Sequence, residues 1–289
     1  MWKIATTLLF IYLSIIVKGQ TQIPASPFIS IDHIPIVVKD LDSIKKVLST
    51  VASFKIKEGK EHEGIRNCFI KFQDGTYLEF TTPVDTLHAI GKYYTERLKQ
   101  GQGGTSLAIS VTNAAAVTTF LISKSIAFEV DSNRIWKTVS PKQADLFFID
   151  YQNKSWKDTE VNTTHPNKAL SLQSTYILSD NLKKDIHTYT SFGFKQSRKG
   201  VYLDLPYTLM VIGNSKLYLL DASQSKKLPT KFNVHNLRGI CGFEIEVSSL
   251  ASLNKLLPKT ENVFIESTQT LFFLKEYNIF FVFNEKGKK

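Results

Sequence analysis

The stretch Ile31-Asp32-His33-Ile34-Pro35-Ile36-Val37-Val38-Lys39-Asp40-Leu41 decides the fold, because versions of its pattern recur three more times along the chain. A histidine stands early in an apolar strand, and the strand ends in a polar turn that opens a helix. The turn matches three later segments, which are Val111-Thr112-Asn113, Leu178-Ser179-Asp180 and Val247-Ser248-Ser249. Asp40 or Asp42 is suited to cap the first helix. An internal repeat of this kind usually decides the architecture of a protein.

Each repeat reads as one strand, one helix and three shorter strands. The first two units span residues 29–83 and 105–151, and a helix-like insert from Leu87 to Gln100 separates them. Two further units follow within residues 169–285, after a polar linker at 152–168. One unit has too small a core to be stable alone. The sequence therefore predicts an α+β fold in which four βαβββ units pair into two curved sheets, with the helices outside.

The N-terminal segment has the pattern of a secretory signal. Lys3 precedes an apolar run from Ile4 to Val17, and small Gly19 follows it. The run is shorter than the roughly 20 residues that span a bilayer, so a cleaved signal peptide over residues 1–19 is expected. An uncleaved anchor is the alternative. We expect an exported protein, periplasmic or extracellular, with no transmembrane segment after cleavage.

Composition argues against several classes of function. The formal charge is +10, but the lysines are scattered, whereas nucleic-acid readers cluster basic residues on one face. We therefore expect a solvated basic surface and no nucleic-acid partner. The chain has no Gly-rich phosphate loop, no Gly-x-Ser-x-Gly elbow and no Cys-x-x-Cys pair. Cys68 and Cys241 lie in apolar surroundings, which favours two separately buried thiols over a disulfide.

Four runs of sequence resemble the glyoxalase-like domain family of the vicinal oxygen chelate (glyoxalase/bleomycin resistance/dioxygenase) superfamily. They are Ile31-Asp32-His33 with 37–41, the strand 66–72, the hairpin 74–80, and 146–151 followed by His165-Pro166-Asn167. The resemblance implies a glyoxalase-like barrel over residues 29–151. It also implies a second, degenerate barrel over 169–285, where the matching positions Gln173, Asp221 and Gly242 make no convincing metal site.

The same resemblance implies where a site would lie. In metal-using members, the first and last strands of each unit supply the ligands, which carries over to His33, Glu79, Ser106 and Asp150. A serine hydroxyl is a poor ligand, so the expected metal ligands are His33, Glu79 and Asp150, with Zn, Mn, Fe or Ni as the divalent ion. The expected substrate contacts are Arg66, Asn67, Tyr77 and Ser106.

Each of these residues also has a structural interpretation. Glu79 could face solvent as an ordinary strand acid, and inside the barrel it would need a metal, an arginine or a proton as partner. Arg66 could anchor an anionic substrate or lie on the surface. His33 could serve a hydrogen-bond network only.

Three functions stay open at this point, because a fold implies much less about the reaction than the site does. The first is a metal-dependent lyase, isomerase or dioxygenase that acts on a small vicinal-oxygen substrate. The second is a metal-free protein that binds or sequesters a small molecule. The third is a structural or partner-binding envelope protein. The sequence predicts neither the substrate nor the oligomeric state.

Overall fold

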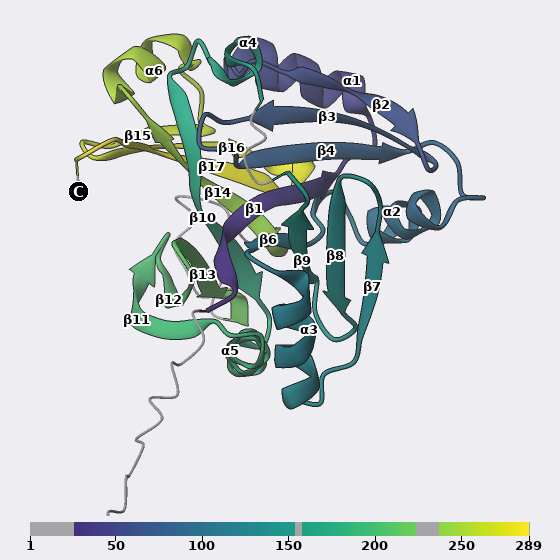
Figure 1. The fold of residues 1–289 in the computed structure, drawn as a ribbon. Helices are drawn as coiled ribbons and strands as arrows, with labels where there is room; N and C mark the ends of the chain where they lie inside the picture. The colour runs from purple at the N-terminus through teal and green to yellow at the C-terminus, as the bar shows by residue number, and fades with distance from the viewer. Residues whose placement is uncertain (1–25, 154–157, 224–236, 289) are drawn as a thin grey trace, which may run out of the picture.

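The structure is a computed structural model that describes residues 26–153, 158–223 and 237–288. The predicted signal peptide lies outside these residues. The order of one strand, one helix and three strands recurs four times along the described chain (Figure 1).

The first two units and their insert have the following bounds. Unit one contains β1 (Phe28–Val37), α1 (Leu41–Lys46) continued by η1 (Val47–Val51), β2 (Lys57–His62), β3 (Ile65–Lys71) and β4 (Tyr77–Pro83). The insert contains α2 (Ala89–Lys99) and β5 (Gly103–Gly104). Unit two contains β6 (Leu107–Val111), α3 (Ala114–Ser123), β7 (Phe128–Ser132), β8 (Trp136–Pro141) and β9 (Leu146–Tyr151).

The last two units follow the short helix α4 (Glu160–Thr163). Unit three contains β10 (Ala169–Ser179), α5 (Leu182–Ser191), β11 (Lys195–Tyr202), β12 (Leu205–Ile212) and β13 (Ser215–Asp221). Unit four contains β14 (Gly239–Val247), α6 (Leu250–Leu256), β15 (Val263–Ile265), β16 (Gln269–Leu274), η4 (Lys275–Tyr277) and β17 (Ile279–Glu285).

The repeated polar turn caps the helix of every unit. The Asp40 carboxylate accepts hydrogen bonds from the backbone N–H groups of Asp42 and Ser43, at 2.9 and 3.1 Å. Asn113, Asn181 and Ser249 cap α3, α5 and α6 in the same way. These side chains satisfy amide donors that a helix start leaves unpaired.

Strand pairing joins units one and two into a first sheet, and units three and four into a second sheet. In each unit the first and last strands pair in parallel, as β1–β4, β6–β9, β10–β13 and β14–β17. Antiparallel pairs β1–β6 and β10–β14 then join unit one to unit two and unit three to unit four. Gly104 of β5 pairs with both Ile36 and Ile240 and so links the two sheets. The α+β class predicted from the sequence is confirmed, whereas the domain boundaries stay predictions.

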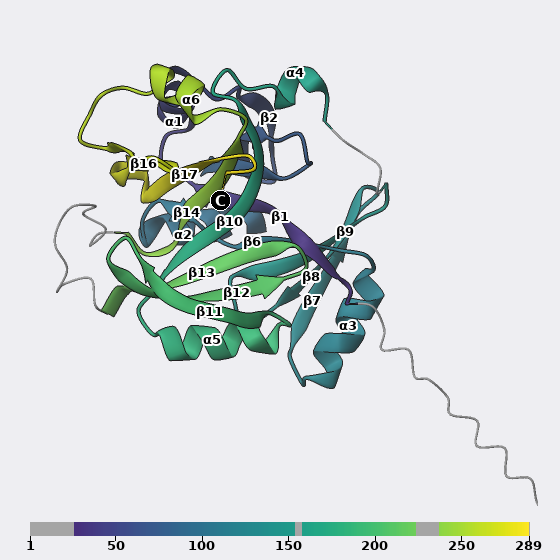
Figure 2. The ribbon, with the colours of Figure 1, turned by 90° about the vertical axis from the view of Figure 1, so that its left-hand side faces the viewer.

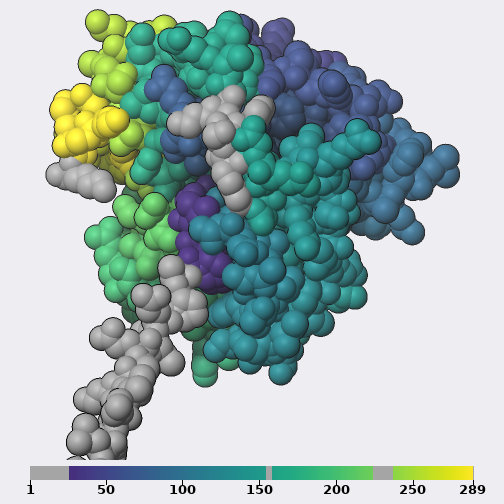
Figure 3. Space-filling model, in the orientation of Figure 1, coloured from purple at the N-terminus to yellow at the C-terminus, as the bar shows by residue number. Residues whose placement is uncertain are grey.

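The two sheets also meet at a pair of related contacts. The turn before β4 meets the start of β10, where Gln73 N–H donates to Leu170 O at 3.1 Å. The turn before β13 meets the start of β1, where Asn214 N–H donates to Ile29 O at 2.8 Å. Gly213 in that turn has a φ of +51°, and an added Cβ would lie 1.8 Å from Ile29 O. In Figure 3 the purple start of β1 accordingly lies beside the green strands of unit three.

The helices cover one face of each sheet (Figures 1 and 2), and we call the opposite face the inner face. One continuous core, from Ile44 of α1 to Leu253 of α6, lies between the helices and the sheets. A second apolar cluster fills the inner face of the second sheet and includes Tyr176, Leu220 and Phe280. Cys68 and Cys241 are buried and unpaired, as expected. Among the described residues, no helix combines the length and the apolar character that crossing a membrane requires.

Candidate functional site

Polar side chains gather on the inner face of the first sheet. Strand alternation separates the two faces of β3, because Cys68 and Ile70 join the helix-covered core while Asn67 and Lys71 point the other way. We call the following seven residues the inner-face cluster: Asp32, His33, Asn67, Lys71, Tyr77, Glu79 and Tyr151.

A β-bulge places two consecutive residues of β1 in this cluster. Ile31 pairs with Ile109 and His33 with Ala108, so Asp32 is the extra residue on its strand. A bulge can turn an additional side chain toward a site. His33 Nδ1 lies 2.6 Å from Asp32 Oδ1, which also accepts a hydrogen bond from Tyr151 Oη at 3.0 Å. The carboxylate therefore holds the imidazole with its proton on Nδ1 and leaves the Nε2 lone pair available.

Aromatic rings fix the plane of this imidazole. The His33 ring stacks on Tyr77 with centroids 4.3 Å apart and meets the Phe147 ring edge-on at 5.5 Å. His33 is only 4% exposed, so its ring has little freedom to reorient.

Glu79 faces the inner side and is partnered there. Asn67 Nδ2 donates to Glu79 Oε1 at 2.8 Å, and Glu79 Oε2 lies 3.9 Å from His33 Nε2. Asn67 is held in turn by Lys60 N–H, which donates to its Oδ1 at 3.1 Å. Gly59 makes this possible, because an added Cβ would lie 1.8 Å from Asn67 Oδ1. The amide thus provides the hydrogen bond that a half-buried carboxylate requires.

Lys71 is the cation of the cluster. It is 8% exposed, and its Nζ lies 3.1 Å from the centroid of the Tyr77 ring and 4.6 Å from that of Phe69. Such cation–π contacts favour a positive charge. Burial nevertheless lowers the pKa of Lys71 to about 8, against the opposing effect of the Glu79 carboxylate.

The insert helix α2 reaches the edge of this site. It packs against β4, and an added Cβ on Gly91 would lie 1.9 Å from Asp85 O, so α2 approaches the β4 end of the sheet closely. Burial raises the pKa of the Tyr94 phenol, and the nearby negative charge of Glu79 raises it further. The insert therefore adds a tyrosine to the surroundings of Glu79.

The structure brings together some of the predicted site residues and not others. His33, Glu79, Asn67 and Tyr77 meet in the inner-face cluster. Ser106 is buried directly before β6. Because its neighbour Leu107 belongs to the helix-covered core, strand alternation directs Ser106 to the other side. Arg66 lies on the outer side, where its Nη2 is 3.5 Å from Asp42 Oδ1 and its side chain is 42% exposed.

Asp150, the predicted third metal ligand, lies on the opposite face from His33 and Glu79. Its Oδ2 accepts a hydrogen bond from Ala114 N–H at 2.9 Å, at the start of α3. Its neighbour Tyr151 points to the inner face instead. We therefore remove Asp150 from the candidate ligand set and assign it a helix-capping role.

The repeat explains why Asp150 resembled a ligand. Pro35 pairs with Glu79 in unit one, and Ala108 pairs with Phe147 in unit two, so Phe147 is the counterpart of Glu79. Asp150 is three residues further along its strand. The carboxylate that recurs there is a capping acid, since Glu285 accepts from Leu250 N–H at the start of α6 at 3.3 Å.

These positions do not fit a resident divalent metal ion. The four ligand positions of the family correspond to His33, Glu79, Ser106 and Phe147, of which only the first two are good ligands. No group of three His, Cys, Asp or Glu residues that could hold a metal occurs in the described part of the chain. Protein metal sites of this type use three or four such ligands. Lys71 adds a positive charge to the same face, which disfavours a cation further.

Sequence reasoning missed Asp32 and Lys71. Asp32 was visible as a second polar residue beside His33 in an otherwise apolar strand. Lys71 was visible from alternation, since it shares a strand face with Asn67. Neither belongs to the ligand positions that the family resemblance implies.

His165 and Asn167, in the run that follows unit two, are structural. His165 Nδ1 accepts from Lys55 N–H at 3.0 Å, and its Nε2–H donates to Lys71 O at 2.9 Å. Burial lowers the pKa of His165 to about 4, so this histidine is neutral. Asn167 Nδ2 donates to Ala52 O at 2.7 Å. His165 thus fixes the backbone that carries Lys71.

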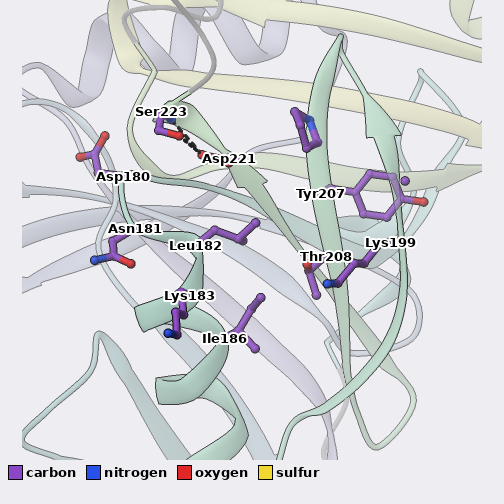
Figure 4. A pocket seen from close by; sticks show the side chains of 12 residues that line it. Asp180, Asn181, Leu182, Lys183, Ile186, Lys199, Tyr207, Thr208, Asp221 and Ser223 are labelled. Carbon is purple, nitrogen blue, oxygen red and sulfur yellow. Dashed lines mark hydrogen bonds between the residues drawn. The ribbon is translucent and has the colours of Figure 1, made fainter.

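A pocket on another part of the surface lies at the start of α5. Figure 4 shows Asp180, Asn181 and Lys183 on one side of it and Tyr207 and Thr208 of β12 on the other. It contains Asp221 at the end of β13 and none of the inner-face cluster.

The fold and the sheet pairing define a vicinal oxygen chelate protein. A family model for the glyoxalase-like domain matches residues 31–192. The match covers more than half of the chain, and the chain belongs to the glyoxalase-like domain family.

Three solved structures with a similar fold have low sequence identity to this chain. A hypothetical protein from Staphylococcus aureus superposes with a TM-score of 0.61 at 13% identity, covering 89% of this chain and 98% of that one. A mutant of 4-hydroxymandelate synthase from Streptomyces coelicolor gives 0.59 at 12% identity, covering 91% and 94%. A xylose isomerase-like TIM barrel/4-hydroxyphenylpyruvate dioxygenase fusion protein gives 0.60 at 12% identity, covering 91% and 50%. No curated protein matches this chain.

Proposed function

We propose that this chain is a metal-free small-molecule-binding protein and that the inner-face cluster is its binding site. The observation that carries the proposal is that, of the four ligand positions of the family, only those of His33 and Glu79 hold good metal ligands. Asn67 donates a hydrogen bond to Glu79, and Asp32 accepts one from His33. Two good ligands beside the Lys71 cation suit a polar organic ligand better than a bare divalent cation.

The chemistry of the cluster favours a small ligand that carries oxygen atoms. Lys71 and Tyr151 supply hydrogen-bond donors, whereas Glu79 and His33 Nε2 supply acceptors. The Phe147 ring supplies an apolar group beside them, whereas the two faces of the Tyr77 ring are covered by His33 and Lys71. Hydroxyl, carbonyl and carboxylate compounds of a few carbon atoms are the class that such a mixture would bind.

A metal-dependent lyase, isomerase or dioxygenase is the competing function. The similarity to 4-hydroxymandelate synthase and to the dioxygenase fusion protein favours it at the level of the fold. It would place Zn, Mn, Fe or Ni between His33 and Glu79 and would need a third ligand from the substrate or from outside the described residues.

We also propose that the protein is exported. This rests on the apolar run from Ile4 to Val17 behind Lys3. N-terminal sequencing of the protein from its natural host tests it, since a mature chain that starts near residue 20 is expected and a retained Met1 would contradict it.

Metal analysis decides between the two functions. The full chain is dialysed against Zn, Mn, Fe(II) and Ni in turn, and bound metal is measured beside His33→Ala and Glu79→Ala. We expect well under one metal per chain, with no difference between the proteins. One tightly bound metal per chain that both variants lose while staying folded would overturn the proposal.

Ligand binding is then tested directly by thermal shift. A panel of small hydroxy, keto and carboxylate compounds is screened against the wild-type chain and Glu79→Gln. A ligand that stabilises only the wild type supports the inner-face cluster as the site. Arg66→Gln is the matched control, because Arg66 lies on the outer side and should bind the ligand as the wild type does.

A further inference from the structure

We propose that Lys71 is an amine nucleophile that forms a Schiff base with a small aldehyde or ketone bound at the inner-face cluster. The inference rests on the proposed function and extends it, because it names the carbonyl group as the feature that the site recognises. It assigns a covalent step to a residue outside the ligand positions of the family.

The Lys71 amine is buried and has no carboxylate partner at ion-pair distance. Its side chain is 8% exposed, and no carboxylate of the described residues comes within the 4.0 Å of an ion pair. The faces of the Tyr77 and Phe69 rings favour the ammonium form, and the effect of burial opposes them. Lysines become nucleophilic when apolar surroundings destabilise the ammonium form. Burial accordingly lowers the pKa of this amine to about 8.

Charged groups from several elements face Lys71. They are Glu79 of β4, Asp32 of β1, Lys57 of β2, and Asp158 after β9. Asp158 pairs with Lys57, so Glu79 and Asp32 are the acids left to act on the amine. They favour its charged form, yet the effect of burial exceeds theirs.

The cluster also holds the groups that the reaction needs for proton transfer. His33 presents Nε2 on the same face, and its Nδ1 is hydrogen-bonded to the Asp32 carboxylate. Glu79 lies beside it at 3.9 Å. The backbone of Lys71 is fixed by the hydrogen bond from His165 to its carbonyl oxygen, which limits where the amine can move.

The proposed step forms one C–N bond and releases one water molecule. The neutral Lys71 amine attacks the carbonyl carbon, a C–N bond forms, and the carbonyl oxygen takes up a proton to give a carbinolamine. The nitrogen gives its proton to His33 or Glu79. The C–O bond then breaks, the hydroxyl leaves as water after a second proton transfer, and a C=N bond remains. No oxidant or reductant is consumed, and water reverses the step.

Reductive trapping tests the inference. The full chain is incubated with glycolaldehyde and sodium cyanoborohydride, which reduces the C=N bond to a stable amine, and the labelled lysines are identified by peptide mass spectrometry. Lys71→Met and Lys71→Arg should lose the principal adduct. Lys99→Met is the matched control, because Lys99 is an exposed lysine of α2 that pairs with Glu96. It should retain the adduct at Lys71.

The pH profile separates a reactive lysine from an accessible one. For a pKa of about 8, labelling should rise about fivefold from pH 7 to 8 and less than about twofold from pH 8 to 9. A lysine with the pKa of a free side chain should rise about tenfold over each step. Labelling of Lys71 that follows the ordinary profile, or that is slower than at Lys99, would overturn the inference.

Binding without trapping distinguishes the two proposals. The melting temperature is measured with glycolaldehyde in the absence of reductant, for the wild type and for Glu79→Gln. Stabilisation of the wild type alone, with no adduct on Lys71, would leave the binding site standing and refute the covalent step. Absence of both stabilisation and adduct across the carbonyl compounds of the panel would refute both.

Discussion

Replacing His165 by Gln should remove a large part of the acid sensitivity of this protein. His165 is 3% exposed, and both of its ring nitrogens are used by the backbone at Lys55 and Lys71. The Nδ1 atom accepts a hydrogen bond, so protonation there would place a donor against a donor. A glutamine offers one acceptor and one donor and does not titrate.

The magnitude follows from the displaced pKa. Its ordinary value of 6.5 applies to the unfolded chain, and burial lowers the pKa to about 4 in the native state. At about 1.4 kcal/mol for each pKa unit, the neutral native histidine corresponds to about 3 kcal/mol. The unfolded state binds more protons between these two pKa values, so stability falls as the pH drops from 6.5 toward 4. The loss is absent above pH 6.5 and complete below pH 4.

Denaturant unfolding at pH 7.5 and pH 4.5 measures this effect. We expect the wild type to lose about 2 to 3 kcal/mol more than His165→Gln between the two pH values. At pH 7.5 the variant should be less stable by up to about 2 kcal/mol, because amide geometry reproduces the two hydrogen bonds imperfectly. Equal acid sensitivity in both proteins would refute the reasoning, since the titration of the remaining groups cancels in the comparison.

Three further predictions test the geometry of the site and the core. Gly59→Ala should displace the Asn67 side chain and lower the free energy of unfolding, measured in urea, by about 2 kcal/mol. It should also weaken ligand binding, and unchanged binding would contradict the support that Asn67 gives to Glu79. Asp150→Ala should cost about 1 kcal/mol through loss of a cap on α3 and leave ligand affinity unchanged, so a loss of binding in calorimetry would return Asp150 to the site. The Cys68 and Cys241 thiols should react with a thiol reagent only in denaturant, because burial raises the pKa of both, to about 12 for Cys68; rapid reaction of the native protein would disprove it.

The fold was predictable because local and long-range signals agree in every unit. The turn that ends β1 supplies a capping residue, and the matching position supplies Asn113 and Ser249 in units two and four. In unit three the cap is Asn181, one residue after the matched Asp180. Even Pro35 is consistent with a central strand, since it lies where β1 passes from β6 to β5 as its partner. A missing N–H is tolerated at such an interruption.

The site was predictable only in part. A repeat aligns residue types along the sequence, whereas the chemistry depends on which face of the sheet each side chain occupies. Glu79 and Asp150 looked equivalent as acids near the ends of matching strands. A shift of three residues along a strand reverses the face, so one acid points inward and the other caps a helix. The bulge at Asp32 has the opposite effect, since it places a residue on the inner face that strict alternation assigns to the core. Bulges depend on partner strands and are not visible in one segment.

A comparison of the two sheets shows how much apolar burial the first sheet loses because its inner face is polar. On the inner face of the first sheet His33 pairs with Tyr77, whereas on the inner face of the second sheet Tyr176 pairs with Tyr218. Two residues after these paired tyrosines, the first sheet carries Glu79 and the second carries fully buried Leu220. Burying a leucine side chain contributes about 1.5 to 3 kcal/mol, whereas a half-buried carboxylate contributes nothing of this kind and requires Asn67 and Gly59 to be held.

Tyrosine stacking completes the apolar filling of the second sheet. Tyr176 stacks on Tyr218 at 4.7 Å and on Tyr202 at 5.2 Å. The absence of a Cβ at Gly242 leaves room for the Phe280 ring, because an added Cβ would lie 2.2 Å from that ring. The second inner face therefore works as a core and supplies stability, which allows the first inner face to hold His33, Glu79 and Lys71 in unfavourable surroundings. That division of roles is expected where half of a duplicated fold carries the site and the other half supports it.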